Sequence, residues 1–176
     1  GGALADVGLR AAGLRHAWGV ELDPRRAAVA RANGFDVTVG DVCDMEPNSF
    51  ACPDWLHMSP PCSNFSQANQ AAAARGFEGR AKEDDKRVLC AGLDFVSQLG
   101  PAWVSIENVP LWAKTRLAAY AKGRLEERGY KITDFVLNAA DFGVAQNRER
   151  YFLVASLLRK PRRPTQTHKE MADWFT

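Results

Sequence analysis

One cysteine in a proline-rich turn and a separate acid-amide pair have the residue types needed for covalent chemistry on a small molecule. Cys62 lies in the run 59–66, SPPCSNFS, directly after the apolar stretch 55–58. Because proline fixes the backbone and removes a donor, this turn would present the thiol in a defined direction. An inert, packed thiol is the commoner state of any single cysteine. The residues that accompany Cys62 therefore decide its role.

Glu107 and Asn108 follow a second apolar stretch, 103–106. If the stretches 55–58 and 103–106 are neighbouring strands, their ends lie about 5 Å apart, so a thiol and a carboxyl group could act on one small ring. Taken singly, Glu107 is more ordinarily a partly buried acid bonded to the next turn, and Asn108 a capping side chain.

Two arginines stand at the entry to a further apolar stretch. In the run 146–150, QNRER, we expect Arg148 and Arg150 to share one face of an extended strand. Guanidinium groups suit planar polar edges and phosphates. The alternative is a charged edge strand in which the arginines pair with acids such as Glu149.

Acidic residues at two earlier strand ends are suited to holding a nucleotide. Glu21 follows Gly2 by 19 positions, the spacing at which a carboxylate holds ribose hydroxyls beside a glycine turn. Asp41 could accept a hydrogen bond from an adenine amino group while Val42 packs on the ring. Helix capping by Glu21 and a turn role for Asp41 are the ordinary alternatives.

For these residues to form one site, the strands that carry them must end at the same edge of a sheet. The hydrophobic pattern of the chain predicts such strands. Helices are predicted from Pro24 to Asn33, over 84–99 and from Pro110 to Gly129. This alternation predicts an α/β fold, a mostly parallel sheet with helices on both faces, with ligands at the carboxyl ends of the strands. Strands are predicted over 18–22, 36–39, 55–58, 103–107, 130–137 and 150–157.

The composition of the chain is that of one globular domain. It has 176 residues, 46% hydrophobic and 25% charged, with a formal net charge of +2 that is too small to indicate a polyanion partner. Its four cysteines lack paired metal-ligand spacing, and no secretion signal precedes them, so we expect no metal and a reducing, cytoplasmic setting. The apolar stretches are shorter than the roughly 20 residues that span a bilayer, so we expect no membrane partner.

In order along the chain, these motifs resemble those of the C5-cytosine methyltransferase family, which methylates cytosine in DNA or, in one branch, tRNA. The resemblance covers almost the whole chain and implies a Rossmann-like fold that uses S-adenosylmethionine. It rests on Gly1-Gly2, GVELD at 19–23, GDV at 40–42, PPCSNFS at 60–66, ENV at 107–109 and LNAADFGVAQNRER at 137–150.

The resemblance implies a catalytic role for each residue of one group. The Cys62 thiolate would add to carbon 6 of cytosine and so activate carbon 5. Glu107 would hydrogen-bond the ring nitrogen N3 and the exocyclic amine, while Asn108 orients its surroundings. Arg150 would hold the carbonyl oxygen of cytosine, with Arg148 close to the base. The target base would be flipped out of the duplex.

The resemblance also implies a cofactor site at the other strand ends. Glu21 would bind the ribose of S-adenosylmethionine, and Asp41 with Val42 would bind its adenine. The remaining residues expected to line the cofactor are Gly1, Gly2, Leu22 and Pro61.

The chain departs from the family pattern at Ser63, where the family often has glutamine, and at its two ends. We expect residues 1–176 to be a partial catalytic domain that lacks a leading strand, a target-recognition domain and a final helix. The target sequence therefore cannot be read. DNA is favoured over tRNA as the substrate because it serves the larger branch of the family.

Three other classes of protein remain as alternatives. The first is a noncatalytic nucleic-acid-binding fragment or subunit of such an enzyme, against which the joint presence of the thiol, the acid and both arginines argues. A thymidylate-synthase-like enzyme would have histidine where Ser63 stands. A nucleotide-binding oxidoreductase would leave the cysteine turn and the arginines unexplained.

Overall fold

The computed structural model describes residues 4–61 and 83–168, so Gly1, Gly2, Cys62 and Ser63 lie outside the described residues. All six predicted strands are confirmed, with bounds that agree or differ by one residue. The strands are β1 (Gly19–Glu21), β2 (Val37–Val39), β3 (Trp55–Met58), β4 (Trp103–Asn108), β5 (Lys131–Asn138) and β6 (Glu149–Ser156). The α-helices are α1 (Leu4–Ala11), α2 (Pro24–Ala32), α4 (Glu83–Leu99) and α5 (Arg116–Glu126), and the 3-10 helices are η1 (Val42–Asp44), η2 (Pro47–Ser49), η4 (Pro110–Lys114) and η5 (Ala139–Phe142).

The α/β class is confirmed, but the sheet is mixed. β1 pairs with β2 in parallel, and the other strands form a sheet in the order β3-β4-β6-β5. β3 and β4 are parallel, whereas β6 runs antiparallel to both of its neighbours. The connection between β5 and β6 holds only residues 139–148, which is too short for the helical crossover that a parallel pair requires.

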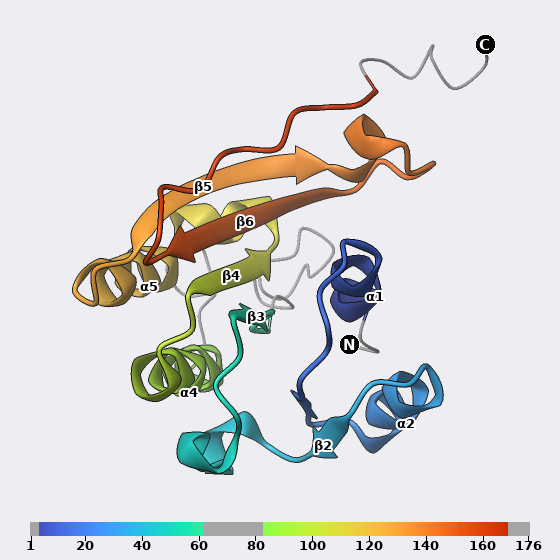
Figure 1. The fold of residues 1–176 in the computed structure, drawn as a ribbon. Coiled ribbons are helices and arrows are strands. Elements are labelled where there is room, and N and C mark those ends of the chain that lie inside the picture. The colour runs from blue at the N-terminus through green and yellow to red at the C-terminus, as the bar shows by residue number, and fades with distance from the viewer. Residues whose placement is uncertain (1–3, 62–82, 169–176) are drawn as a thin grey trace.

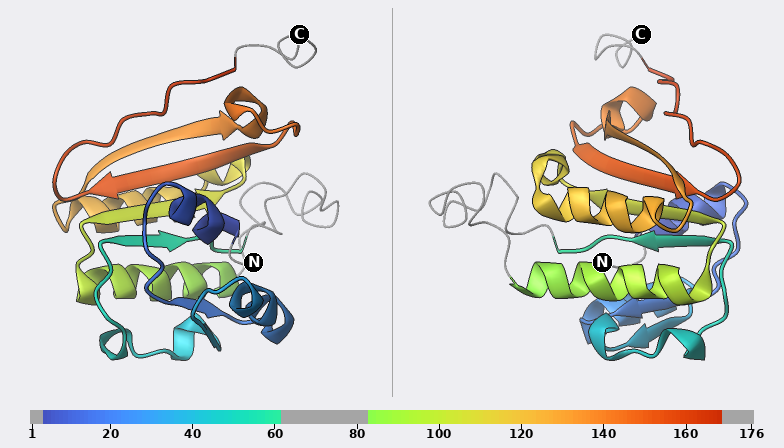
Figure 2. Two further views of the ribbon diagram at one scale, coloured as in Figure 1. Left: turned by 45° about the vertical axis from the view of Figure 1, so that its right-hand side comes forward. Right: turned by 90° about the vertical axis from the view of Figure 1, so that its left-hand side faces the viewer.

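Helices lie on both sides of the strands, as the alternating pattern predicts. Figures 1 and 2 show α4 and α5 on one side, with α1 and α2 on the other. The side chains of Val104, Ile106 and Leu153 are fully buried on the face toward α4 and α5. Leu89 and Leu93 of α4 complete this core from the helical side. The apolar residues of α4 and α5 recur at helical spacing and so form one face. This face packs on the strands that carry the site.

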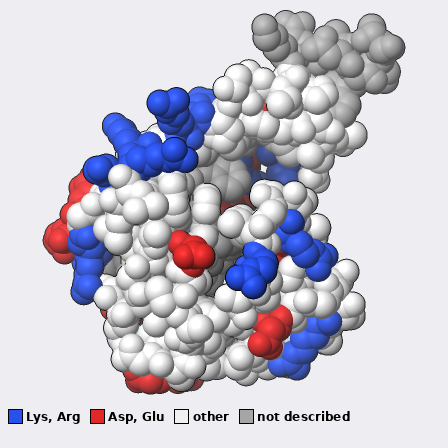
Figure 3. All heavy atoms as spheres, in the orientation of Figure 1, with Lys and Arg blue, Asp and Glu red and all other residues white. Residues whose placement is uncertain are grey.

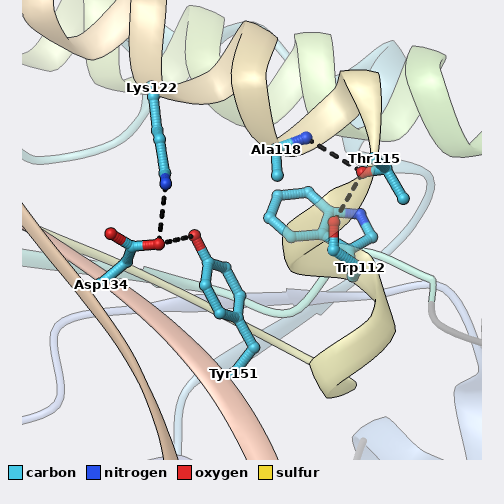
Figure 4. A network of polar contacts seen from close by, with 6 residues as sticks. All are labelled: Trp112, Thr115, Ala118, Lys122, Asp134 and Tyr151. Atoms are coloured by element: carbon cyan, nitrogen blue, oxygen red, sulfur yellow. Dashed lines mark hydrogen bonds and ion pairs between the residues drawn. The ribbon is translucent and has the colours of Figure 1, made fainter.

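The beginning of α5 differs from the prediction and is fixed by a hydroxyl group. Instead of one helix from Pro110, the chain forms the short helix η4 and then α5, with Thr115 as the N-cap between them. The Thr115 hydroxyl donates to the carbonyl of Trp112 at 2.7 Å and accepts from the amide of Ala118 at 3.1 Å (Figure 4). It thus ends one helix and begins the next.

Polar side chains join α5 to the antiparallel strands. Lys122 Nζ and the Tyr151 hydroxyl both donate to Asp134 Oδ2, at 2.7 and 3.0 Å (Figure 4). Burial opposes ionisation of Asp134, but these two bonds outweigh it and lower the pKa of its carboxyl group. The cluster fixes β5 and β6 beneath α5, and β6 carries Arg150 to the site.

Among the described residues, no helix is long and apolar enough to cross a membrane. Within the same residues, β1 and β2 form one hydrogen-bonded sheet, and the other four strands form a second, separate sheet.

Candidate active site

A carboxylate and a guanidinium group meet at the end of β4. Arg150 Nε lies 3.0 Å from Glu107 Oε1, and each side chain is 24% exposed. Glu107 pairs with Phe152 across the sheet, so Arg150, two positions earlier on β6, lies diagonally opposite on the same face. The antiparallel direction of β6 therefore brings its first residues to the carboxyl end of β4. The side chains of Glu107 and Arg150 are thus in direct contact at this strand end.

Asn108 connects this strand end to the turn that leads to Cys62. Its side chain is almost fully buried, and Nδ2 donates to the carbonyl of Pro60 at 3.1 Å. Its Oδ1 accepts from the amide of Val109 at 2.9 Å. Because β3 and β4 are parallel neighbours, the turn after β3 begins beside the end of β4. Cys62 is therefore attached to a segment that Asn108 holds at this edge, although the thiol itself is outside the described residues.

Arg148 has a different environment from the one predicted. β6 begins at Glu149, so Gln146 and Arg148 lie in the preceding loop rather than on one face of a strand. The amide of Arg148 donates to Asn138 Oδ1 at 3.0 Å, and the residue is exposed. The loop departs from the alternating pattern because Asn138 satisfies backbone groups that a strand would pair. Of the two arginines, Arg150 is the one in contact with Glu107.

The cofactor candidates lie at the ends of β1 and β2. Glu21 pairs with Val39 in the parallel register, and the amide of Gly40 donates to the Glu21 carbonyl at 3.1 Å. Glu21 Oε1 accepts from the amide of Asp23 at 3.1 Å, so the capping role foreseen as the alternative is present. Leu22 is 67% exposed. An acidic and an apolar side chain thus stand together at the end of β1.

Asp41 is oriented by two partners. Its Oδ1 accepts from the amide of Cys43 at 2.9 Å, and its Oδ2 lies 2.6 Å from Arg87 Nη2. The bond from the Cys43 amide is the main cause of the lowered pKa of Asp41, and Arg87 adds to it. Arg87 belongs to α4, the helix that follows the segment containing Cys62. The sequence pattern missed this contact because it joins positions 46 apart on different elements.

Other described groups are less suited to nucleophilic or metal chemistry. Burial, with further effect from Asp41, raises the pKa of the Cys43 thiol to about 11, which disfavours the reactive thiolate. Among residues 4–61 and 83–168, no three His, Cys, Asp or Glu side chains are grouped to hold a metal ion. Of the remaining predicted cofactor residues, Pro61 is exposed and Val42 is half-buried.

A cavity of about 220 Å³ lies between η1, η2 and α4. Of the proposed site residues in the described part of the chain, only Val42 lines it. The lining residues are Val42, Cys43, Met45, Glu46, Pro47, Ala91, Asp94, Phe95 and Gln98.

Solved structures define the class of fold. The S. pombe Dnmt2 methyltransferase matches with a TM-score of 0.71 at 18% identity, over 90% of this chain and 47% of that one. A putative DNA modification methyltransferase from an E. coli prophage gives a TM-score of 0.70 at 20% identity, over 89% and 43% of the two chains. The fold is that of the Rossmann-like methyltransferases, as predicted.

Sequence comparison then identifies the family. The model of the C-5 cytosine-specific DNA methylase family matches residues 1–173, and this chain belongs to that family. Type II methyltransferase M.NaeI of Lentzea aerocolonigenes is 35% identical over 85% of this chain, and M.NlaX of Neisseria lactamica is 31% identical over 82%. The chain spans only 36% and 45% of the lengths of these relatives.

Proposed function

We propose that the protein transfers a methyl group from S-adenosylmethionine to carbon 5 of cytosine in DNA, and that residues 1–176 are part of its catalytic domain. The observation that carries the proposal is the Glu107–Arg150 pair at the end of β4, next to the turn that Asn108 holds. The family membership and the names of the Type II relatives support DNA as the substrate.

The chemistry assigned to the pair follows from the donors and acceptors that cytosine presents. Along one side of the ring lie the exocyclic amine, N3 and the carbonyl oxygen. Glu107 can accept a hydrogen bond from the amine and, as the protonated acid, donate one to N3, while Arg150, a donor only, binds the carbonyl oxygen. The ion pair of 3.0 Å holds the two groups side by side, so both could reach one edge of the ring. Together they withdraw charge from the ring and favour attack on carbon 6.

Cys62 is the proposed nucleophile. The turn enters its segment through Pro60, whose carbonyl is fixed by the buried Asn108 amide. A thiolate held beside Glu107 and Arg150 would form a bond to carbon 6, which would make carbon 5 nucleophilic enough to take the methyl group as its bond to the donor sulfonium breaks; loss of the proton from carbon 5 and of the sulfur from carbon 6 would then restore the ring. Because these atoms are covered in a duplex, the base must leave the stack to react.

The residues at the ends of β1 and β2 fit S-adenosylmethionine, which would supply the methyl group. Glu21 offers a carboxylate for the ribose hydroxyls, and Asp41 offers carboxylate lone pairs for the adenine amine. The exposed Leu22 and half-buried Val42 provide apolar surface beside these carboxylates. Gly1, Gly2 and Pro61 remain proposed cofactor contacts on the family pattern.

Covalent trapping tests this function. The intact protein, incubated with S-adenosylmethionine and duplex DNA carrying 5-fluorocytosine, should form a stable adduct, because fluorine prevents the final elimination from carbon 5. Cys62→Ala should lose the adduct but keep its affinity for S-adenosylmethionine, and Cys52→Ala, an exposed cysteine elsewhere, should behave as wild type. Failure of the folded wild type to form an adduct, or methylation of tRNA in place of DNA, would contradict the proposal.

A further inference from the structure

The connection between β5 and β6, residues 139–148, carries Arg148 and leads directly to Arg150. Packing holds it weakly, because no residue of η5 is buried and residues 143–149 are all exposed. A segment with few buried apolar contacts keeps one conformation only if hydrogen bonds restrain it. The position of Arg148 therefore depends on the polar contacts of this connection.

Asn138, the last residue of β5, restrains the connection from within. Its Oδ1 accepts from the amides of Ala140 and Arg148, at 3.2 and 3.0 Å. Its Nδ2 donates to Asn147 Oδ1 at 2.7 Å, and the amide of Ala139 donates to the carbonyl of Arg148 at 3.0 Å. Both main-chain groups of Arg148 are thus bonded, while the residue itself is exposed.

A second restraint comes from the C-terminal segment, which returns along β5 after β6 has ended. Thr133 Oγ1 donates to the carbonyl of Pro161 at 2.7 Å, and Arg163 Nη2 donates to the carbonyl of Val136 at 3.2 Å. These contacts advance in the same direction along the segment and along β5, as Figure 1 shows. The segment therefore reaches the end of β5 from which the connection starts.

Three successive residues of this segment, 166–168, bind Asp141 of η5, and we call them the clamp. The amides of Thr167 and His168 both donate to the Asp141 carbonyl at 3.0 Å. Gln166 Nε2 donates to Asp141 Oδ2 at 2.7 Å, a bond that the carboxylate charge strengthens. The clamp thus holds Asp141 by its main chain and by its side chain.

Gly143, which follows η5, lies directly against the clamp. Its φ of +85° places it in the left-handed region that favours glycine. A Cβ atom at this position would lie 2.9 Å from Cε1 of His168, so a side chain here would displace the ring. The turn out of η5 therefore packs directly on the clamp.

We propose that the clamp fixes the connection between β5 and β6 and so positions Arg148 for the DNA substrate. Asn138 bonds residues near the two ends of the connection, whereas the clamp restrains η5 between them. Asp141 and Gln166 are then positioning residues, because they act on the substrate through the connection. The effect on the reaction rests on the proposed function, but the effect on the connection does not.

Substitutions in the clamp and in Asp141 separate this role from general stability. Thr167→Pro removes an amide donor to Asp141, and Thr165→Pro, in the same segment but outside the clamp, is the matched control. Gln166→Ala and Asp141→Ala each remove the side-chain bond, whereas Asp141→Asn keeps an oxygen that can accept from Gln166. Circular dichroism and thermal unfolding establish that each variant is folded before it is compared.

The first measurement is amide hydrogen exchange, followed by NMR, in the protein without DNA. The amides of Val144 and Arg148 are both bonded to the start of the connection, so their exchange reports on its order. In Thr167→Pro both should exchange at least about tenfold faster than in wild type, and in Thr165→Pro within about twofold of it. Unchanged exchange at Val144 and Arg148 in Thr167→Pro would overturn the inference.

The second measurement is the rate of adduct formation on 5-fluorocytosine DNA. Thr167→Pro should be about tenfold slower than wild type, with unchanged affinity for S-adenosylmethionine. Gln166→Ala and Asp141→Ala should each be about threefold slower, and their double variant no slower than either, because both remove one bond. Asp141→Asn should stay within about twofold of wild type. A wild-type rate in Thr167→Pro, or additive losses in the double variant, would contradict the positioning role.

Together, the two measurements separate this inference from the proposed function. Faster exchange in Thr167→Pro, combined with no adduct from the folded wild type, would support the clamp and refute the proposed reaction. Normal exchange and a normal adduct rate in every variant would leave the proposed function intact and refute the clamp.

Discussion

At the scale of single residues, the site depends on side chains that are each held by a second group. Glu107 is paired with Arg150, and the buried side-chain amide of Asn108 donates a hydrogen bond to the carbonyl of Pro60. Asp41 is held by Arg87 and by the amide of Cys43. Such paired groups lose less freedom when a ligand binds, because their orientation is set beforehand.

Arg87→Met tests whether this orientation matters for the cofactor. Removing the guanidinium group leaves Asp41 with the amide of Cys43 alone, so its second oxygen is free to rotate away from adenine. We expect affinity for S-adenosylmethionine, measured by calorimetry, to fall about tenfold, the effect of one charge-assisted hydrogen bond. Lys86→Met, on the neighbouring and equally exposed position, should leave affinity within a factor of about two. Equal losses in both variants would point to general charge and not to Asp41.

At the scale of elements, the strands and helices follow from local sequence, but their pairing does not. Asp23 caps α2, which begins at Pro24 as predicted, and Gly34 ends it with a φ of +79°, a conformation that favours glycine. The insertion of β6 between β4 and β5 joins residues far apart in the chain, which periodicity cannot show. The prediction for Arg148 was wrong for a related reason. It placed Arg148 on the same strand as Arg150, whereas Arg148 lies in the loop before β6, where its amide bonds to Asn138. Arg87 was missed because its partner Asp41 lies 46 positions away on another part of the fold.

The junction between η4 and α5 offers a test of an element that positions the site indirectly. Thr115→Ala removes both hydroxyl contacts, with Trp112 and with Ala118, in a buried position. We expect it to lower the free energy of unfolding by about 1–2 kcal/mol, measured by urea denaturation. Thr165→Ala, in the exposed C-terminal segment, should change it by less than about 0.5 kcal/mol. A loss no larger than in that control would mean that η4 and α5 do not depend on the cap.

At the scale of the whole molecule, charge does not mark the site. The face in Figure 3 shows Lys and Arg side chains interspersed with acidic ones, with a basic group at its upper left. The basic run 159–163 follows the end of β6 that pairs with Trp103, whereas Glu107 is at the other end of β4. The run is held against β5, since Thr133 Oγ1 donates to the carbonyl of Pro161 at 2.7 Å. The basic run and the Glu107–Arg150 pair therefore lie at opposite ends of β4.

The same paired groups predict how the stability of the whole fold depends on pH. The pKa of His57 is lowered in the folded protein, so the unfolded chain takes up a proton first, and stability falls as the pH drops below about 6.5. The pKa values of Asp23, Asp41 and Asp134 are also lowered. Their contribution is complete above the unfolded value of about 3.8 and is lost as the pH falls through the folded values.

Urea midpoints measured from pH 8 to pH 3 should therefore fall in two stages. His57→Gln should reduce the first stage, because its side chain does not titrate, and leave the second. Asp134→Asn should reduce the second stage only, since it removes a carboxylate held by Lys122 and Tyr151. If His57→Gln left the first stage unchanged, the burial of a neutral imidazole between Ser105 and Ser59 would not be a feature of the folded protein in solution.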